Sequence, residues 1–266
     1  MAEPRVLVLR APGTNCDVET ADAFLRAGAA ADRVHVNRLI ENPALPDRYQ
    51  ILCLPGGFSY GDDIAAGAVL ATRLRRSLGE MIDAFVDGDR LVLGICNGMQ
   101  VLMRLGVLTA GVDPDSKIRP ATLTWNDRGR FEDRWVHLAI DERSPCVFTR
   151  GVASMYLPMA HAEGKFVARD ADALDALRSA GRLPLRYARP GATSIEEDLL
   201  PFPDNPNGGD ANVAGVCDVS GRVFGLMPHP ERHVDPLQHP SWTRRRTQPA
   251  EGDGMAVFRN AVAYFG

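Results

Sequence analysis

The cysteine at position 96 stands in a pattern that suits a covalent nucleophile. Residues 94–98 read G-I-C-N-G, between an apolar strand-like run and a segment with helical periodicity. A nucleophile elbow has this form, because glycines two residues either side of the nucleophile let strand and helix approach closely. The positive end of the helix dipole favours a thiolate there, and the Asn97 N–H is placed to stabilise an oxyanion. A buried structural cysteine remains the alternative for this motif alone.

A histidine and a glutamate follow a second strand-like run. Residues 227–231 read M-P-H-P-E. A catalytic cysteine needs a base, and that base usually needs an orienting group. His229 and Glu231 are two residues apart, and the prolines around His229 disfavour helix, so an extended backbone would project both side chains to one side. We therefore expect Glu231 to orient the His229 imidazole toward Cys96.

A glycine-rich segment follows a third strand-like run. Residues 55–62 read P-G-G-F-S-Y-G-D. Backbone N–H groups in such a segment can bind an anion or an oxyanion. The Lys-Ser/Thr of a P-loop is missing, and the chain has no G-x-G-x-x-G. The sequence therefore gives no recognisable ATP or dinucleotide site.

Two rival assignments use other histidines. Residues 161–163 read H-A-E, so His161 and Glu163 form a second H-x-E pair. We favour His229 and Glu231, because they follow a core-like strand and His161 follows a region that looks added to the core. His233 extends the first pair to H-x-E-x-H, but a lone alternating triplet is weak support for a metal. We expect no metal site.

The elements that must position these residues alternate between strands and helices in the first 105 residues. Strands are expected at 6–9, 50–54 and 91–95, and helices after a cap at Asn15 or Asp17, at 63–75, at 77–87 before Gly88, and at 97–105. This alternation predicts an α/β fold, a three-layer, mostly parallel, flavodoxin-like sheet with helices on both faces. Ligands bind such sheets at the carboxyl ends of the strands.

The rest of the chain departs from this alternation. Residues 118–168, and 135–140 above all, alternate polar and apolar side chains, which predicts an added antiparallel region. A hairpin is expected at 213–226 and a final helix at 255–265. Long loops are expected near 189–212 and 234–254, where they carry partner contacts or are simply solvated. We predict a single domain over residues 1–266 with these two loops inserted.

Composition limits the class of protein. Hydrophobic residues make up 45% of the 266 residues, and the 30 basic and 34 acidic residues give a net charge of −4. This balance argues against nucleic acid as the main partner. The sequence has no apolar run long enough for a membrane helix and no signal peptide, so we expect a cytoplasmic protein. The five widely spaced cysteines argue against a disulfide framework.

At these motifs the chain resembles class I glutamine amidotransferases and, within them, the glutaminase subunits of phosphoribosylformylglycinamidine synthase. The cysteine elbow and the H-P-E are common to the class. Residues 12–17 (P-G-T-N-C-D) and 55–62 (G-G-F-S-Y-G-D after the proline) are more specific to this subunit. The likeness continues at 94–100 (G-I-C-N-G-M-Q), 160–164 (A-H-A-E-G) and 227–232 (M-P-H-P-E-R).

The resemblance implies a catalytic triad and a reaction. Cys96 would be the nucleophile, His229 the general acid and base, and Glu231 its orienting group. L-Glutamine would be hydrolysed to glutamate and ammonia through a cysteinyl thioester. The backbone N–H groups of Gly57 and Asn97 would form the oxyanion hole. Four residues would lie near the bound glutamine: Gly56, Phe58, Ser59 and Gln100.

The resemblance also implies partners. In the family, ammonia passes to a large synthetase subunit that uses ATP and formylglycinamide ribonucleotide in de novo purine (IMP) biosynthesis, and a small third subunit commonly helps assembly. ATP and magnesium are expected on the synthetase, and no cofactor is expected in this chain. The chain departs from the family at Ala162, where H-G-E-G is usual, and in its two long loops. Cys16 is expected to have a structural role near the first helix.

Three other functions stay open at this point. One is a glutaminase of another amidotransferase pathway, which the continuation F-S-Y-G-D at 58–62 argues against. Another is a cysteine peptidase or γ-glutamyl hydrolase on the same fold, which would act on peptides or γ-glutamyl conjugates rather than glutamine. The last is a binding or chaperone-like relative that has lost activity, against which the intact Cys, His and Glu set speaks.

Overall fold

The computed structural model describes residues 3–113, 118–245 and 247–266 of the chain. Within them, the fold is built on a nine-stranded mixed sheet in the order β2-β1-β3-β4-β11-β10-β9-β6-β7. The first part of this order is parallel, and its strands are β1 (Arg5–Arg10), β2 (Ala30–His35), β3 (Ile51–Leu54), β4 (Leu91–Ile95) and β11 (Val223–Leu226). Buried aliphatic side chains dominate β3, β4 and β11, as expected for parallel strands covered on both faces.

The remaining strands are antiparallel. β10 (Val213–Cys217), β9 (Leu185–Ala188), β6 (Glu132–Ile140) and β7 (Ser154–His161) extend the sheet beyond β11. β5 (Ala121–Thr124) and β8 (Lys165–Ala168) form a separate two-stranded ladder. The prediction of an α/β fold with an added antiparallel region is therefore confirmed, as is the hairpin within 213–226.

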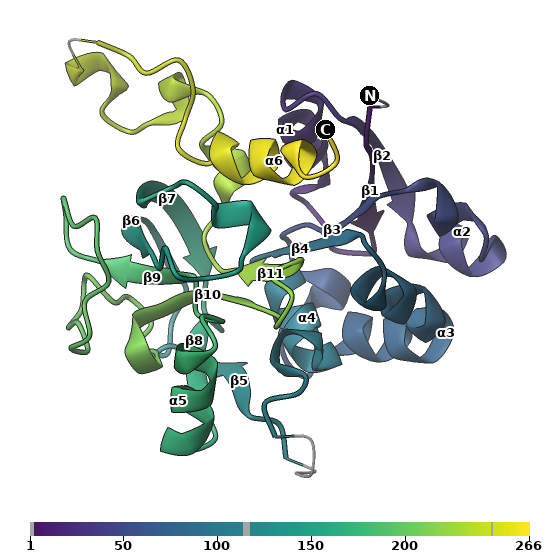
Figure 1. Ribbon diagram of the computed structural model, residues 1–266, viewed down its shortest axis with the longest axis horizontal. Helices are drawn as coiled ribbons and strands as arrows, with labels where there is room; N and C mark the ends of the chain where they lie inside the picture. Colours follow the sequence, from purple (N-terminus) through teal and green to yellow (C-terminus); the bar gives the residue numbers. More distant parts are fainter. Residues whose placement is uncertain (1–2, 114–117, 246) are drawn as a thin grey trace.

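Helices cover both faces of the sheet (Figure 1). α1 (Asp17–Arg26) and α6 (Met255–Ala263) lie together on one face, where the rings of Phe24 and Phe258 are 4.9 Å apart. α3 (Ala68–Asp87) and α4 (Asn97–Leu105) pack together on the other face. α2 (Val36–Glu41) lies beside β2, and α5 (Ala171–Ser179) packs against β8. This arrangement is the three-layer one that the sequence predicts.

The predicted pair of helices at 63–75 and 77–87 is wrong. One helix, α3, covers residues 68–87, and the expected break survives as a distortion at Leu78 (φ −139°, ψ 23°). The segment before it is not helical, because Ile64 and Gly67 have positive φ angles of 73° and 71°. The predicted cap of α1 is also wrong: Cys16 occupies the N-cap position, with no side-chain hydrogen bond from a cap.

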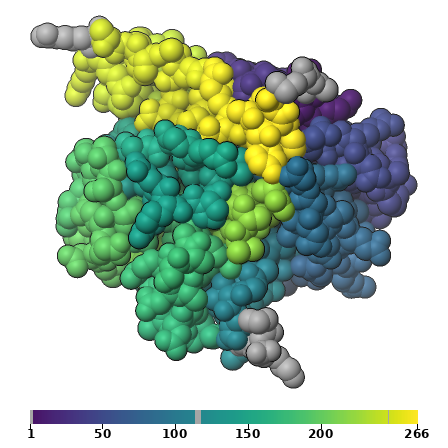
Figure 2. Space-filling view, in the orientation of Figure 1, coloured from purple at the N-terminus to yellow at the C-terminus, as the bar shows by residue number. Residues whose placement is uncertain are grey.

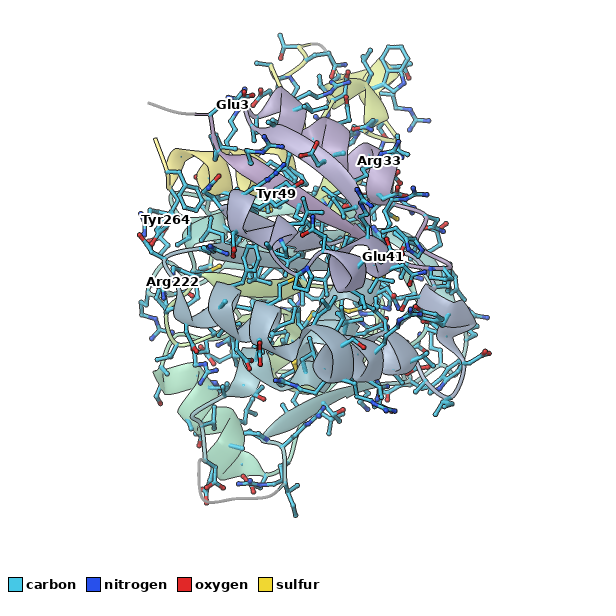
Figure 3. All side chains as sticks on the ribbon, turned by 90° about the vertical axis from the view of Figure 1, so that its right-hand side faces the viewer. Glu3, Arg33, Glu41, Tyr49, Arg222 and Tyr264 are labelled. Atoms are coloured by element: carbon cyan, nitrogen blue, oxygen red, sulfur yellow. The ribbon has the colours of Figure 1, made fainter. Side chains whose placement is uncertain are left out.

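Four elements were not predicted: β2, α2, α5 and β9. β2 reads A-A-D-R-V-H and forms one edge of the sheet, on the side of the molecule that faces the viewer in Figure 3, where Arg33 of this strand is labelled. Charged side chains protect exposed edges from pairing with other chains. Asp32 pairs with Arg5 at 2.6 Å and Arg33 with Asp17 at 3.2 Å. Because β2 carries these charged side chains, its sequence lacks the apolar pattern by which strands are predicted.

Both predicted loops are irregular apart from short 3₁₀ turns, and residue 246 of the second lies outside the described part. The C-terminal segment runs beside β6 and β7 (yellow beside teal in Figure 2). It is fastened there by Asp253, which accepts the Tyr156 N–H at 2.8 Å, and by His233, whose Nδ1 lies 2.9 Å from the Tyr156 carbonyl oxygen. The single-domain assignment stays a prediction. No helix in the described residues is long and apolar enough to cross a membrane.

Candidate active site

The chemical motifs meet because they follow neighbouring parallel strands. β1, β3, β4 and β11 are adjacent in that order, and each runs directly into one motif. Leu54 pairs with Gly94, and Ile95 pairs with Leu226, so β3, β4 and β11 end at nearly the same level. The carboxyl ends of parallel strands share one edge, and the glycine-rich segment, the cysteine elbow and the H-P-E meet there.

Cys96 occupies a strained turn between β4 and α4. Its φ of 51° and ψ of −105° are outside the regions that non-glycine residues ordinarily occupy. The turn is held by the Cys96 N–H, which donates to the Leu226 carbonyl at 2.7 Å. A Cβ on Gly94 would lie 2.6 Å from Leu102 Cδ1, and one on Gly98 would lie 1.9 Å from the Leu54 carbonyl oxygen. The glycines are therefore required by close approach, as the elbow pattern predicts.

Gly98→Ala is expected to lower the free energy of unfolding by about 3 kcal/mol, because the added methyl group overlaps a backbone carbonyl that cannot turn aside. Gly79→Ala is the matched control, since Gly79 also lies within a helix and an added Cβ there meets only the Arg75 side chain at 3.9 Å. The control should gain about 0.5–1 kcal/mol from helix propensity. Urea unfolding of both variants measures the difference, and equal effects would contradict this account of the elbow.

His229 and Glu231 form a buried pair. His229 Nδ1 lies 2.6 Å from Glu231 Oε1, and the side chains are 4% and 0% exposed. The His229 N–H donates to the Pro158 carbonyl at 2.8 Å, which docks the motif on β7. The expected extended backbone holds at His229 only, because residues Pro230–Arg232 form a short 3₁₀ turn. The turn, rather than strand geometry, brings the carboxylate to the imidazole.

The surroundings of His229 make its imidazole a stronger base. Burial alone would lower the pKa of the imidazole, but the Glu231 carboxylate and the neighbouring Cys96 and Cys16 thiols outweigh it, so its pKa is raised well above the ordinary value. Since Nδ1 is bonded to Glu231, Nε2 remains for proton exchange with a reacting group. This is the electrostatic role of an orienting carboxylate in a catalytic triad.

A cavity of about 300 Å³ opens beside Cys96. Of the predicted site residues, Cys96, Gly57, Phe58 and Gln100 line it. The other lining residues come from the Asp62 turn, from the segment between β5 and β6, and from the end of β7 and the residues after it: Asp62, Ala66, Trp125, Phe131, Ala160, His161, Ala162 and Glu163. A volume at the lower end of the range for small-molecule pockets suits a ligand the size of an amino acid.

Gly56 and Ser59 do not line this cavity. A Cβ on Gly56 would lie 2.7 Å from His229 Cε1, so this glycine makes room for the imidazole. Ser59 is buried, and its N–H donates to Asn97 Oδ1 at 3.1 Å, which ties the glycine-rich segment to the elbow. Their predicted contact with substrate stays a prediction.

Neither of the two N–H groups predicted for the oxyanion hole donates to a backbone carbonyl of the described residues. Gly57 faces Thr14 in an antiparallel bridge whose flanking hydrogen bonds are made by Phe58 and Asn15. In such a non-hydrogen-bonded pair the Gly57 N–H points away from the neighbouring segment. Asn97 is the first residue of α4, where an N–H has no partner within the helix. Their role as an oxyanion hole stays a prediction.

The second H-x-E pair does not form a dyad. Glu163 accepts the Ala66 N–H with both oxygens at 3.2 Å and lies 3.6 Å from Arg104 Nη2. The buried His161 ring has no hydrogen-bond partner among the described residues. Burial, with a smaller contribution from His229, lowers the pKa of His161 to about 3, so this ring is neutral at neutral pH. His161 is therefore free to bond to a molecule in the cavity.

The cavity also holds a carboxyl group that the sequence reading did not single out. Asp62 lines it, and Asp62 Oδ1 accepts the Gly67 N–H at 3.2 Å and the Asn97 side-chain amide at 2.9 Å. Burial raises the pKa of Asp62. Its position in the conspicuous stretch 55–62 was the only signal that could have identified it. Gln100 donates to the Glu163 carbonyl at 2.6 Å, so its amide is also fixed by the wall of the cavity.

Cys16 and His233 lie in places that their motifs did not reveal. Cys16 Sγ is 4.0 Å from His229 Nδ1, so this thiol is beside the imidazole as well as at the start of α1. His233 Nδ1 instead faces the Tyr156 carbonyl, and its ring lies 5.0 Å from that of Trp135. The side chains of the H-x-E-x-H triplet therefore do not face a common point, as a metal site formed by them would require.

Comparisons with known proteins agree on one group. A family model described as a CobB/CobQ-like glutamine amidotransferase domain matches residues 3–265. The chain is 43% identical over 264 residues to phosphoribosylformylglycinamidine synthase subunit PurQ of Dehalococcoides mccartyi, covering 99% of this chain and 98% of that one. It is 38% identical over 271 residues to the subunit of the same name from Methanococcus maripaludis, covering 98% and 97%. A solved structure of PurLQS from Thermotoga maritima superposes with a TM-score of 0.71 at 30% identity, covering 100% of both chains.

Proposed function

Because the chain belongs to the CobB/CobQ-like glutamine amidotransferase family, we propose that it is the glutaminase subunit of phosphoribosylformylglycinamidine synthase, acting in purine biosynthesis. The observation that carries this proposal is a strained cysteine turn next to a histidine whose far nitrogen is bonded to a buried carboxylate. The substrate is L-glutamine, and the products of this subunit are glutamate and ammonia.

The first half of the reaction transfers the glutamyl group to Cys96. His229 Nε2 removes the thiol proton, and Sγ attacks the side-chain amide carbon of glutamine. The oxygen of this carbon becomes negative, and the N–H groups of Gly57 and Asn97 stabilise it. The imidazolium gives its proton to the amide nitrogen, the C–N bond breaks, and ammonia leaves. Glu231 keeps the imidazole oriented and stabilises its positive charge.

The second half releases glutamate. A water molecule attacks the thioester carbon while His229 takes one of its protons. The bond between sulfur and carbon then breaks, and the proton returns to the Cys96 sulfur. The same two N–H groups stabilise the second oxyanion, so a single preorganised site serves both steps. The proposed steps use only side chains and backbone groups of this chain and water, and the absence of a cofactor in this chain stays a prediction.

The partner is a large synthetase subunit that holds ATP and magnesium and consumes the ammonia, and a small third subunit belongs to the same assembly. The family resemblance supports this, as does the mouth of the cavity. Three aromatic side chains that line it are about half exposed, namely Phe58 (45%), Trp125 (54%) and Phe131 (49%). Aromatic side chains exposed together are typical of a protein interface. A partner seated there would receive ammonia before it escapes to solvent.

Glutamate release from glutamine is expected to rise at least about tenfold when the synthetase, formylglycinamide ribonucleotide and ATP are added, since partner closure would exclude water and complete the site. The assay measures glutamate with the chain alone and with the full mixture. Omitting the ribonucleotide alone is the control, because the synthetase is then present without its acceptor. A rate of glutamate release that does not change with the full mixture would support glutaminase activity but contradict the assignment to this pathway.

A further inference from the structure

Cys16 lies against the side of the triad that faces away from the cavity. The residue is 1% exposed, and Cys16 Sγ is 4.0 Å from His229 Nδ1, the nitrogen that also contacts Glu231. Gly56 permits this contact, because a Cβ there would lie 3.0 Å from the sulfur and 2.7 Å from His229 Cε1. The proposed reaction uses the Cys96 thiol and assigns no role to the Cys16 thiol.

Three different donor atoms converge at this place. One ligand atom each from Cys16, His229 and Glu231 lies within 4.8 Å of the others. The second carboxylate oxygen of Glu231, Oε2, is buried and has no hydrogen-bond partner among the described residues. A sulfur, an imidazole nitrogen and a carboxylate oxygen are the ligands that Zn²⁺ takes in proteins. We infer that Zn²⁺ binds Cys16, His229 and Glu231 and thereby inhibits the enzyme.

The geometry needs only modest movement. Tetrahedral zinc with ordinary bond lengths separates a sulfur and a nitrogen ligand by about 3.6 Å, and a nitrogen and an oxygen ligand by about 3.4 Å. The observed separation of Cys16 Sγ and His229 Nδ1 is 4.0 Å, close to this value. His229 and Glu231 must part from 2.6 Å, and the unpaired Oε2 lets the carboxylate rotate as they do so.

Arg232 controls access to these donors. Its Nη2 lies 3.0 Å from the Cys16 sulfur, where a positive charge opposes an incoming cation. The same guanidinium is 3.6 Å from Glu19 on α1, and the Arg232 side chain is 38% exposed. The side chain can therefore turn toward Glu19 and solvent and leave the sulfur open. The Asn15 amide oxygen, 3.1 Å from Sγ, remains as a neutral neighbour.

Zinc at this place blocks catalysis by changing the imidazole. The Cys16 thiol loses its proton to solvent, and the metal takes the Nδ1 lone pair while the ring proton moves to Nε2. An imidazole that is protonated on Nε2 and bound to metal on Nδ1 cannot accept the proton of Cys96. Glu231 is held by the metal at the same time. Inhibition rests on the proposed function, whereas metal binding does not.

Cadmium is the probe for binding, because Cd²⁺ takes the same ligands and its bond to a thiolate absorbs in the ultraviolet. The titration uses the full chain carrying Cys96→Ala, which removes the other thiol near His229. We expect a saturable absorbance that falls to background when Cys16→Ser is added and weakens at least about tenfold in affinity with Glu231→Gln. An absorbance unchanged by Cys16→Ser overturns the site, whether or not the chain is a glutaminase.

Zinc inhibition of glutamate release is the second measurement. Each variant is compared with its own zinc-free rate, and we expect Cys16→Ser to raise the half-inhibitory zinc concentration about tenfold or more. Cys53→Ser is the matched control, since Cys53 is a buried thiol on neighbouring β3, and Cys146→Ser replaces it if that variant does not fold. Equal sensitivity of Cys16→Ser and wild type places the inhibitory metal elsewhere and overturns the inference.

Discussion

Replacing Cys96 by alanine is expected to abolish glutamate release from glutamine, with a loss of about 10⁴-fold or more. The reason is chemical, because no other side chain of the described cavity can form the thioester from the strained turn between β4 and α4. The assay compares glutamate release by wild type and Cys96→Ala in the presence of the synthetase, formylglycinamide ribonucleotide and ATP. Supplying ammonium in place of glutamine should restore product formation to the same rate with both.

Cys16→Ala is the matched control for this prediction. It also removes a buried thiol next to His229, yet it leaves the proposed nucleophile intact, so most of the glutamate release should remain. An equal loss of glutamate release in the two variants would contradict the assignment of Cys96 as the nucleophile. A large loss in Cys16→Ala alone would move the nucleophile to the P-G-T-N-C-D motif.

His229→Ala is expected to lower kcat by about 10³–10⁴-fold, whereas His161→Ala should change it by less than about tenfold. Nδ1 of His229 is bonded to the Glu231 carboxylate, which supports a proton on the ring. His161 has no carboxylate partner in the part of the chain that the structure describes, and its pKa of about 3 makes it a poor base at neutral pH. Initial rates over a range of glutamine concentrations separate kcat from KM.

A loss of His161 should appear mainly in KM, because its ring lines the cavity and its nitrogens have no hydrogen-bond partner among the described residues. Circular dichroism of each variant checks that the fold is retained. Glu231→Gln supplies a further control, since it keeps the shape of the orienting group and removes its charge. It should lower kcat, and combining it with His161→Ala should not restore kcat. The reverse ranking of the two histidines would move the base to the second H-x-E pair.

Much of the site was predictable because parallel strands place their carboxyl ends together. Apolar runs at 51–54, 91–95 and 223–226 could be recognised in the sequence, and each is followed by unusual residues. The elbow glycines had a steric meaning that the structure confirms at Gly94 and Gly98. What failed was local: α3 begins late because Ile64 and Gly67 have positive φ angles, which no periodicity reveals.

The remaining features depend on contacts between distant segments. β2 is an edge strand with charged side chains, so it lacks the apolar run that marks a buried strand. The Asp62 carboxyl group and the His161 ring line the same cavity from segments far apart in the sequence, and spacing along the chain cannot show this. The approach of Cys16 to His229 joins residues 213 positions apart and depends on the missing side chain of Gly56.

The role of Cys96 as the nucleophile is tested most directly by locating the covalent intermediate. The chain, with its synthetase partner, is mixed with glutamine and quenched in acid within the first turnovers, and its peptides are examined by mass spectrometry. We expect a glutamyl thioester on the peptide that contains Cys96, and we expect it to accumulate when hydrolysis is slowed. A glutamyl group on Cys16, or glutamate release with no adduct on any cysteine, would contradict this role.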